Sequence, residues 1–199
     1  AETGEALENL DAIIAVDGVD GVAFQLMLED LARERLRAYD ADEGLDLGVK
    51  VPNFVFNVLD YILWDLGRNP SAEAGPLWAA LGDVERSVLS QRAGSFRFRY
   101  RTSVEHFYPV IPGEGQKVLT STEVNRFGNL CIMGRRENSQ RNNLMPVSKV
   151  KQYSSDEQSL KFQLMAGILD VEGDWDSPQI RKHGNSMRRM IQEWQGKRP

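Results

Sequence analysis

The chain has 199 residues, of which 41% are hydrophobic and 27% charged, and its formal net charge is −5. This is the composition of an ordinary globular protein with one large or two small domains, and it argues against a disordered chain. The single cysteine, Cys131, excludes a disulfide framework and a multi-cysteine zinc site, and no apolar run is long enough to span a bilayer.

The first ninety residues are predicted to be helical. Residues 24–39 carry apolar side chains at amphipathic spacing, and residues 40–44 form a polar break. The segment 53–66 is apolar on nearly all sides, with Asn53 as a possible helix cap. Because it is too short to cross a membrane, we expect it to be the central buried helix. A third helix is predicted over residues 77–91.

The β signal is confined to residues 96–104, where aromatic residues and arginines alternate with period 2. Alternation places the aromatic side chains on one face and the arginines on the other: Phe96, Phe98 and Tyr100 against Arg97, Arg99 and Arg101. We expect at least two of these arginines to be solvated.

The remaining elements are again helical, apart from a short apolar run at residues 130–133. Residues 135–143 are expected to open a helix, and core helices are predicted over 154–169 and 180–194. We assign the methionines of the last helix and Trp194 to the core.

The predicted fold is therefore mainly α with a small β element. We divide it into an N-terminal helical region, residues 1–92, and a second region, residues 93–199, which contains the β element and the C-terminal helices. We expect one compact unit.

The chemistry is concentrated around Glu105 and His106. Hydrolysis of a phosphodiester needs a base and a cation that stabilises negative charge. His106 is the natural base because imidazole titrates near neutrality and, of the two histidines, it alone lies in the basic, strand-linked block. Glu105 and the amide oxygen of Asn138 would suffice to hold Mg²⁺ or another hard divalent cation. Since neighbours on a strand face opposite sides, Glu105 and His106 share a site only if the strand ends there.

Gly128-Asn129 is the second element of interest. An asparagine that hydrogen-bonds a neighbouring loop would orient the segment that carries the base. Gly128 would supply a backbone conformation closed to other residues. A plain turn is the alternative reading of this pair.

The charge distribution favours a polyanionic substrate. Residues 1–90 carry 18 acidic and 6 basic side chains, whereas residues 91–151 carry 11 basic and 4 acidic ones. Local cationic groups provide phosphate affinity, although a solvated basic face would look the same. The candidate DNA-binding residues are Arg99, Arg126, Arg135, Arg136, Arg141, Asn143 and Lys149.

The order of these motifs resembles a known family. The segments Val104-Glu105-His106-Phe107-Tyr108-Pro109, then Asn125-Arg126-Phe127-Gly128-Asn129-Leu130, then Asn138-Ser139 with Asn143, then Lys149, are similar to the C-terminal His-Asn-His (HNH) nuclease domain of GmrSD-type, modification-dependent restriction endonucleases. Trp175, Ile180 and Arg181 resemble the closing segment of that family. The resemblance covers residues 96–195; Phe107-Tyr108 and His183 depart from the family pattern.

The resemblance implies a ββα-metal (His-Me finger) core around one Mg²⁺. His106 would be the general base, Asn129 the structural asparagine, Asn138 a metal ligand and Glu105 its carboxylate partner. It further implies nicking of double-stranded DNA, a role in antiviral defence in the bacterial cytoplasm, and a nucleotide-hydrolysing domain in the N-terminal part of the same full-length protein. SspE-like members sense phosphorothioate DNA. Since the chain begins at Ala1 without methionine, we expect it to be a fragment of such a protein.

Three hypotheses follow. The first is a metal-dependent DNA-nicking domain, which predicts cleavage that depends on His106. The second is a non-catalytic DNA-binding module that keeps the HNH fold, which predicts salt-sensitive binding without cleavage. The third is a helical interaction domain in which His106 and Asn129 only close hydrogen bonds. The sequence does not identify the DNA modification, the sequence preference or the oligomeric state.

Overall fold

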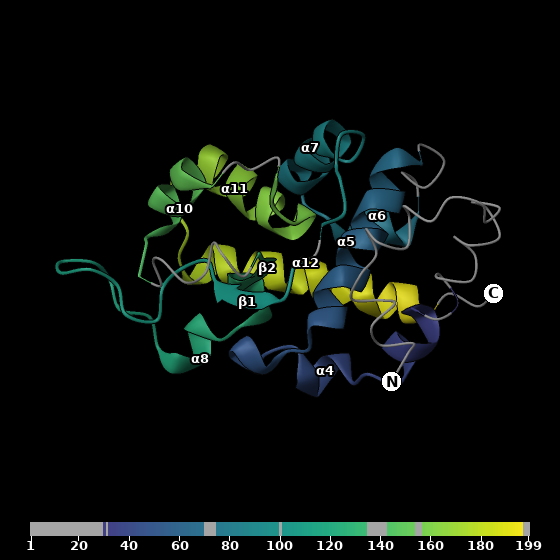
Figure 1. The fold of residues 1–199 in the computed structure, drawn as a ribbon, viewed down its shortest axis with the longest axis horizontal. Coiled ribbons are helices and arrows are strands. Elements are labelled where there is room, and N and C mark those ends of the chain that lie inside the picture. The colour runs from purple at the N-terminus through teal and green to yellow at the C-terminus, as the bar shows by residue number, and fades with distance from the viewer. Residues whose placement is uncertain are drawn as a thin grey trace.

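The protein is mostly helical, as a computed structural model shows for residues 30, 32–69, 75–99, 101–134, 143–153 and 157–196 (Figure 1). These residues include one two-stranded antiparallel sheet, which confirms the prediction of a mainly α protein with a small β element. The elements, in chain order, are α4 (Ala41–Gly44), η1 (Gly48–Lys50), α5 (Asn53–Arg68), α6 (Pro76–Ala80), α7 (Asp83–Arg92), β1 (Ser103–His106), α8 (Ser121–Val124), η3 (Phe127–Asn129), β2 (Leu130–Met133), α10 (Pro146–Gln152), α11 (Leu160–Glu172) and α12 (Ser177–Gly196).

The central buried helix is α5, as predicted. Every residue from 54 to 63 is buried, and the helix packs against α7, α11 and α12. Asn53 does not cap it, because the N-cap position is occupied by Pro52. The Asn53 side chain instead donates a hydrogen bond to the carbonyl oxygen of Thr102, 3.0 Å away, and so ties α5 to the segment that leads into β1.

The single helix predicted over residues 77–91 is two helices, α6 and α7. The chain is extended at Leu81 and Gly82, where glycine has a low helix propensity. The Glu85 carboxylate accepts the N–H of Gly82 at 2.7 Å and caps the first turn of α7. The break is therefore stabilised by a side chain that the new helix itself provides.

The strand predicted over residues 96–104 is wrong at its start, because β1 begins at Ser103. Phe96 and Phe98 contact each other edge to face, and Phe98 also contacts Trp64 of α5. The alternation therefore reflects packing of an irregular segment on a helix rather than pairing in a sheet. The prediction that at least two of the three arginines are solvated is confirmed, since Arg97 and Arg99 are exposed. Arg101 is buried, and Tyr100 lies outside the described residues.

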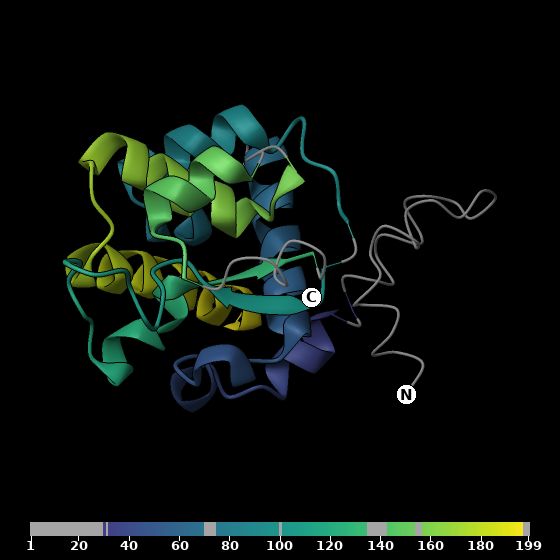
Figure 2. The same cartoon turned by 60° about the vertical axis from the view of Figure 1, so that its left-hand side comes forward.

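The two strands lie between two hydrophobic clusters. The antiparallel register places Val104 opposite Ile132 and Glu105 opposite Cys131. Because successive residues on a strand face opposite sides, Val104 and Ile132 join the larger cluster around α5 and α12, whereas Cys131 joins a smaller cluster built on α11. Figures 1 and 2 show the sheet between α10 and α11 on one side and α4 on the other.

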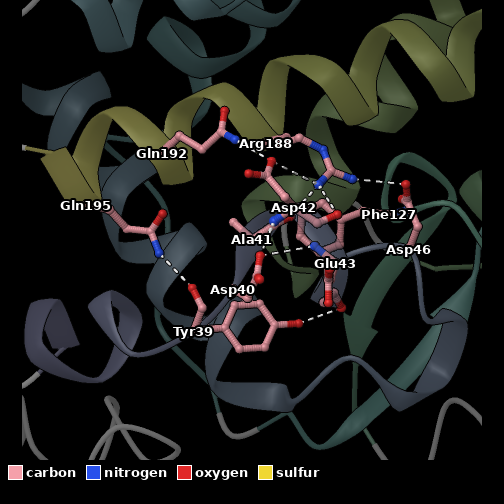
Figure 3. A network of polar contacts seen from close by, with 11 residues as sticks. Tyr39, Asp40, Ala41, Asp42, Glu43, Asp46, Phe127, Arg188, Gln192 and Gln195 are labelled. Atoms are coloured by element: carbon pink, nitrogen blue, oxygen red, sulfur yellow. Dashed lines mark hydrogen bonds and ion pairs between the residues drawn. The ribbon is translucent and has the colours of Figure 1, made fainter.

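The segment predicted as a polar break contains α4, which begins after Asp40; the Asp40 carboxylate accepts the N–H groups of residues 42 and 43. Figure 3 shows how α12 holds this segment. Arg188 donates to the carbonyl oxygens of Ala41 and Asp42 and to the carboxylate of Asp46 at 2.9 Å. The other Asp46 oxygen accepts the N–H of Phe127 at 2.8 Å, so the network also fixes η3.

The C-terminal helices confirm the predicted core. Met187, Met190 and Trp194 of α12 are all buried. Helix α11 begins only at Leu160, because the Ser159 hydroxyl accepts the N–H of Phe162 and caps the helix there. Of the helix predicted over 135–143, residues 135–142 lie outside the described part of the chain. Helix α10 starts at Pro146, a residue suited to a first helical position.

The larger cluster contains residues from Ala32 to Trp194, so both sides of the predicted boundary at position 92 contribute to one core. The division into 1–92 and 93–199 stays a prediction. Of the helix predicted over 24–39, residues 30 and 32–37 are helical, and the others before 32 lie outside the described residues. No helix in the described residues has the length and apolarity needed to cross a membrane.

Candidate functional site

Glu105 and His106 are the last two residues of β1, so the strand ends where a shared site requires it to end. Glu105 pairs with Cys131 and His106 with Leu130. Their side chains leave the strand toward different neighbours: His106 reaches Asn125, whereas Glu105 lies near the ammonium group of Lys149. The charge of Lys149 acts on both side chains.

His106 is half-buried, and its Nε2 atom lies 2.9 Å from Oδ1 of Asn125. Burial lowers the pKa of His106, the hydrogen bond with Asn125 opposes this effect, and the positive charge of Lys149 lowers the pKa further. The net shift is downward, so the imidazole is neutral at neutral pH. A neutral imidazole with access to solvent can accept a proton.

Asn129 is fully buried and has four hydrogen bonds through its side chain. Its Oδ1 accepts the N–H of Tyr108 at 2.8 Å and the indole N–H of Trp175 at 3.2 Å. Its Nδ2 donates to the carbonyl oxygens of Tyr108 at 3.0 Å and of Val124 at 2.9 Å. Its main-chain oxygen also accepts the N–H of Phe107 at 2.7 Å. Asn129 thus binds the two residues that follow His106, and it is more than the residue of a plain turn.

Gly128 is required for a reason other than the predicted one. Its φ is not positive, so it supplies no conformation closed to other residues. A Cβ atom at Gly128 would instead overlap the carbonyl oxygen of Ile180 in α12. The glycine permits α12 to approach η3 closely, and this packing supports the turn that contains Asn129.

Lys149 of α10 is only 3% exposed, and its ammonium group donates to the main-chain carbonyl oxygen of His106. Burial lowers its pKa, whereas Cys131 and Glu105 act to raise it. Burial raises the pKa of the half-buried Glu105, and Lys149 and Ser103 act to lower it. Lys149 therefore contacts the end of β1 from inside the protein and presents little surface to a DNA molecule.

A second buried lysine was not predicted from the sequence. Lys161 is 1% exposed and donates to the carbonyl oxygens of Phe127 at 2.9 Å and Leu130 at 2.5 Å, which flank Gly128-Asn129. Burial lowers its pKa to about 7. The Lys161 N–H donates to Asp60 of α5, whose pKa burial raises to about 6. The available signal was a charged residue inside an otherwise uncharged run, Lys161 within residues 160–169 and Asp60 within residues 54–64.

The other histidine, His183 of α12, lies in the interior. It is 1% exposed, and its Nδ1 is 2.5 Å from the carboxylate of Glu85. Burial and the positive charge of Lys161 lower the pKa of His183, Glu85 acts to raise it, and the net shift is downward. Burial would raise the pKa of Glu85, but hydrogen bonds from His183 and Gly82 outweigh it and the net shift is downward. The ring of His183 also contacts Trp175 edge to face, at 5.8 Å between centroids.

The predicted DNA-binding residues that the structure describes differ in exposure. The Arg99 side chain is 52% exposed and forms an ion pair with Glu157 at 3.4 Å. Arg126 is half-buried and Asn143 is exposed. The predicted residues outside the described part of the chain are Arg135, Arg136, Asn138 and Arg141. Within the described ranges, no group of three or more His, Cys, Asp or Glu side chains could hold a metal ion.

Comparison with known proteins identifies the chain. Residues 53–190 match the family described as GmrSD restriction endonucleases, C-terminal domain. The chain belongs to this family. Neither curated proteins nor solved structures give a significant match. The GmrSD match begins at the first residue of α5, so it includes more of the helical front than the resemblance to the sequence motifs covered. Membership indicates a nuclease domain of a restriction system, with DNA as its substrate.

Proposed function

We propose that this GmrSD C-terminal domain is a divalent-metal-dependent DNA-nicking domain of the His-Asn-His type, with β1, β2 and a following helix as a ββα-metal core. One observation carries the proposal: Asn129 holds the backbone that follows His106. Its main chain binds Phe107, and its side chain binds both the N–H and the carbonyl of Tyr108. A carboxamide remote in sequence thus fixes the segment that bears the imidazole.

In this proposal His106 is the general base. It takes a proton from the water that attacks the phosphodiester, a role for which its lowered pKa keeps it in the neutral form. Asn129 orients the segment and does not itself move a proton. Lys149 fixes the carbonyl of His106, so the base is held through its main chain as well as through its side-chain contact with Asn125.

Glu105 and Asn138 would hold the divalent cation, Mg²⁺ in the simplest case. Their donors are one carboxylate and one carboxamide oxygen, which suit a hard cation that keeps several waters. Glu105 fits in its chemistry, since burial in the present surroundings raises the pKa of its carboxylate and a cation would favour its ionised form. Asn138 lies outside the described residues, and its role rests on the motif. A bound ion stabilises charge on the phosphate and the leaving oxygen.

The biological setting that we propose follows from the family. The domain would nick one strand of double-stranded DNA per active site in an antiphage, modification-dependent system of the bacterial cytoplasm. A nucleotide-hydrolysing domain of the same full-length protein would control it, and phosphorothioate is one modification that such a system could sense. Arg99, Arg126, Arg135, Arg136, Arg141 and Asn143 would contact the DNA backbone.

The test is the conversion of supercoiled plasmid to the open circle by the 199-residue chain, with Mg²⁺ and with a chelator. We expect nicking only with the metal, and a reduction by about 10²- to 10⁴-fold in His106→Ala, the usual contribution of general-base catalysis. Glu193→Ala is the matched control, because Glu193 is an exposed residue of α12. It should leave the rate unchanged.

Two results would contradict the proposal. Metal-dependent nicking that His106→Ala does not alter would exclude His106 as the base. Salt-sensitive retention of the plasmid without any open circle, at high enzyme concentration, would favour the alternative of a DNA-binding or positioning module that retains the HNH fold.

A further inference from the structure

Asn125 begins one of the motif segments but has no role assigned from the sequence, and its side chain lies against His106. It follows the last residue of α8, and its Oδ1 is 2.9 Å from Nε2 of His106. The contact links segments remote in sequence. Among the described residues, it is the only hydrogen bond of the His106 ring. What this contact does depends on which atom carries the hydrogen.

The orientation of the Asn125 amide answers that question. Its Nδ2 lies 2.9 Å from the carbonyl oxygen of Ser121, and a carbonyl can only accept a hydrogen bond. The amide nitrogen must therefore face Ser121, which leaves Oδ1 facing His106. Because an amide oxygen is also only an acceptor, Nε2 of His106 must carry the hydrogen. In the neutral imidazole, the lone pair is then on Nδ1.

Gly48 of η1 closes the third side of the amide. Its N–H donates to the main-chain oxygen of Asn125 at 3.2 Å, and its φ is +60°. A Cβ atom at Gly48 would overlap Oδ1 of Asn125, and it would also meet a backbone conformation that side chains rarely adopt. Any residue other than glycine would therefore push the amide oxygen away from His106.

We infer that Asn125 is a positioning residue that fixes His106 in the Nε2–H tautomer and thereby presents Nδ1 as the proton acceptor. The inference rests on the proposed function for its catalytic meaning, but the tautomer itself does not. Asn129 holds the backbone of this segment, Lys149 holds its carbonyl, and Asn125 sets which nitrogen is the base. The three contacts use different atoms and are separately removable.

Long-range ¹H–¹⁵N spectra of the ¹⁵N-labelled 199-residue chain, recorded without metal or DNA, test the tautomer directly. The chain has two histidines, so the loss of one set of signals in His106→Ala assigns both. We expect a protonated Nε2 and a bare Nδ1 in His106. His183 is an internal reference of the opposite kind, because its Nδ1 faces the Glu85 carboxylate. A protonated Nδ1 in His106 would overturn the inference whatever the nuclease does.

Variants connect the tautomer to the reaction. Asn125→Leu, which cannot accept a hydrogen bond, should give a mixture of tautomers and reduce kcat for nicking roughly 10- to 100-fold, with little change in KM. Asn125→Asp keeps an acceptor for Nε2–H and should retain the tautomer and most of the rate. Gly48→Ala disturbs the Asn125 amide from another element, so it should also mix the tautomers and reduce kcat. It keeps the test available if Asn125→Leu does not fold. Thr122→Ala, an exposed change on α8, is the control.

The outcomes separate the two proposals. If the wild-type chain shows the expected tautomer but nicks no plasmid, the proposed function fails and the role of Asn125 in fixing the ring stands. If the wild-type chain nicks plasmid and Asn125→Leu shifts the tautomer without changing kcat, the proposed function stands and the positioning role is wrong. Equal losses in Thr122→Ala and Asn125→Leu would also overturn it, since they would report damage to α8.

Discussion

The two histidines occupy opposite kinds of environment. His106 is half-buried at the end of a strand and contacts a neutral amide, whereas His183 is buried inside the helical core and contacts a carboxylate. Burial lowers the pKa of both rings. What distinguishes them is access and the partner: only His106 can meet a substrate. A lowered pKa alone would not have separated a candidate base from a structural histidine.

The largest effect that this comparison predicts is on stability, and it concerns His183. His183→Ala leaves the ionised Glu85 buried without its main donor, which should cost about 3–5 kcal/mol. His106→Ala should cost about 1 kcal/mol or less, because it removes one bond at a half-buried position. Urea unfolding of both variants measures the difference. Similar losses in the two variants would contradict the proposed difference between the two environments.

A double variant tests whether the unpaired carboxylate causes the loss in His183→Ala. Replacing Glu85 and His183 together by leucine removes the buried charge, so it should recover part of the loss seen in His183→Ala, although the Gly82 N–H then loses its acceptor. No recovery would mean that shape, rather than the unpaired carboxylate, dominates the cost.

The next largest effect is expected at Asn129, which lies between the two histidine regions. Asn129→Ala leaves the N–H of Tyr108, the indole N–H of Trp175 and two carbonyl groups without their partner. The expected loss is about 3 kcal/mol, since each unsatisfied buried group costs about 1–3 kcal/mol and such costs do not add fully. Hydrogen exchange should accelerate most at the Tyr108 amide. Uniform acceleration throughout the chain would contradict a local role.

The fold was predictable where one interpretation of the apolar pattern is physically possible. Residues 54–63 are apolar on nearly all sides, and a helix that is too short to cross a membrane buries such a surface only at the centre of the fold. The alternation at 96–99 was ambiguous, because a single buried aromatic face can pack on a helix or in a sheet. The break between α6 and α7 was not predicted, because it depends on the contact by which Glu85 caps its own helix. The spacing of apolar residues does not reveal such a contact.

The candidate site was predictable only in its motif residues. His106 and Asn129 stand out by residue type and order, and the structure brings their backbones together. Lys161, Asn125 and Gly48 act through tertiary contacts with atoms of distant segments, so no local pattern shows what they do, although Asn125 belongs to one of the motif segments. The sequence does show that Lys161 is the one charged residue within 160–169, a run of core character.

A smaller, pH-dependent effect is expected from Lys161, which supports the segment around Asn129. Its folded pKa of about 7 is below the unfolded value of about 10.5, so between these values the unfolded chain holds the proton and the folded chain does not. Stability should therefore rise with pH from about 7 upward, by roughly 1 kcal/mol per pH unit. Lys161→Met should lose this slope in urea midpoints measured at pH 7, 8 and 9. Lys151→Met, an exposed change, should keep it; a slope unchanged in Lys161→Met would contradict the assignment.

The smallest effect on stability is expected at the exposed ion pair of Arg99. A small loss of stability there, together with weaker DNA binding, would show that the two are separate properties of this domain. The ion pair of Arg99 with Glu157 joins two side chains that are each 52% exposed, so Arg99→Gln should change stability by less than about 1 kcal/mol. In a His106→Ala background, which prevents cleavage, it should reduce the slope of log binding constant against log salt by about 0.9 if Arg99 neutralises one phosphate. Fluorescence anisotropy with a labelled duplex gives this slope.

The exposed neighbour Arg97 provides the control. An equal reduction in Arg97→Gln would indicate diffuse attraction to the basic surface, whereas an unchanged slope in Arg99→Gln would exclude Arg99 from the DNA interface.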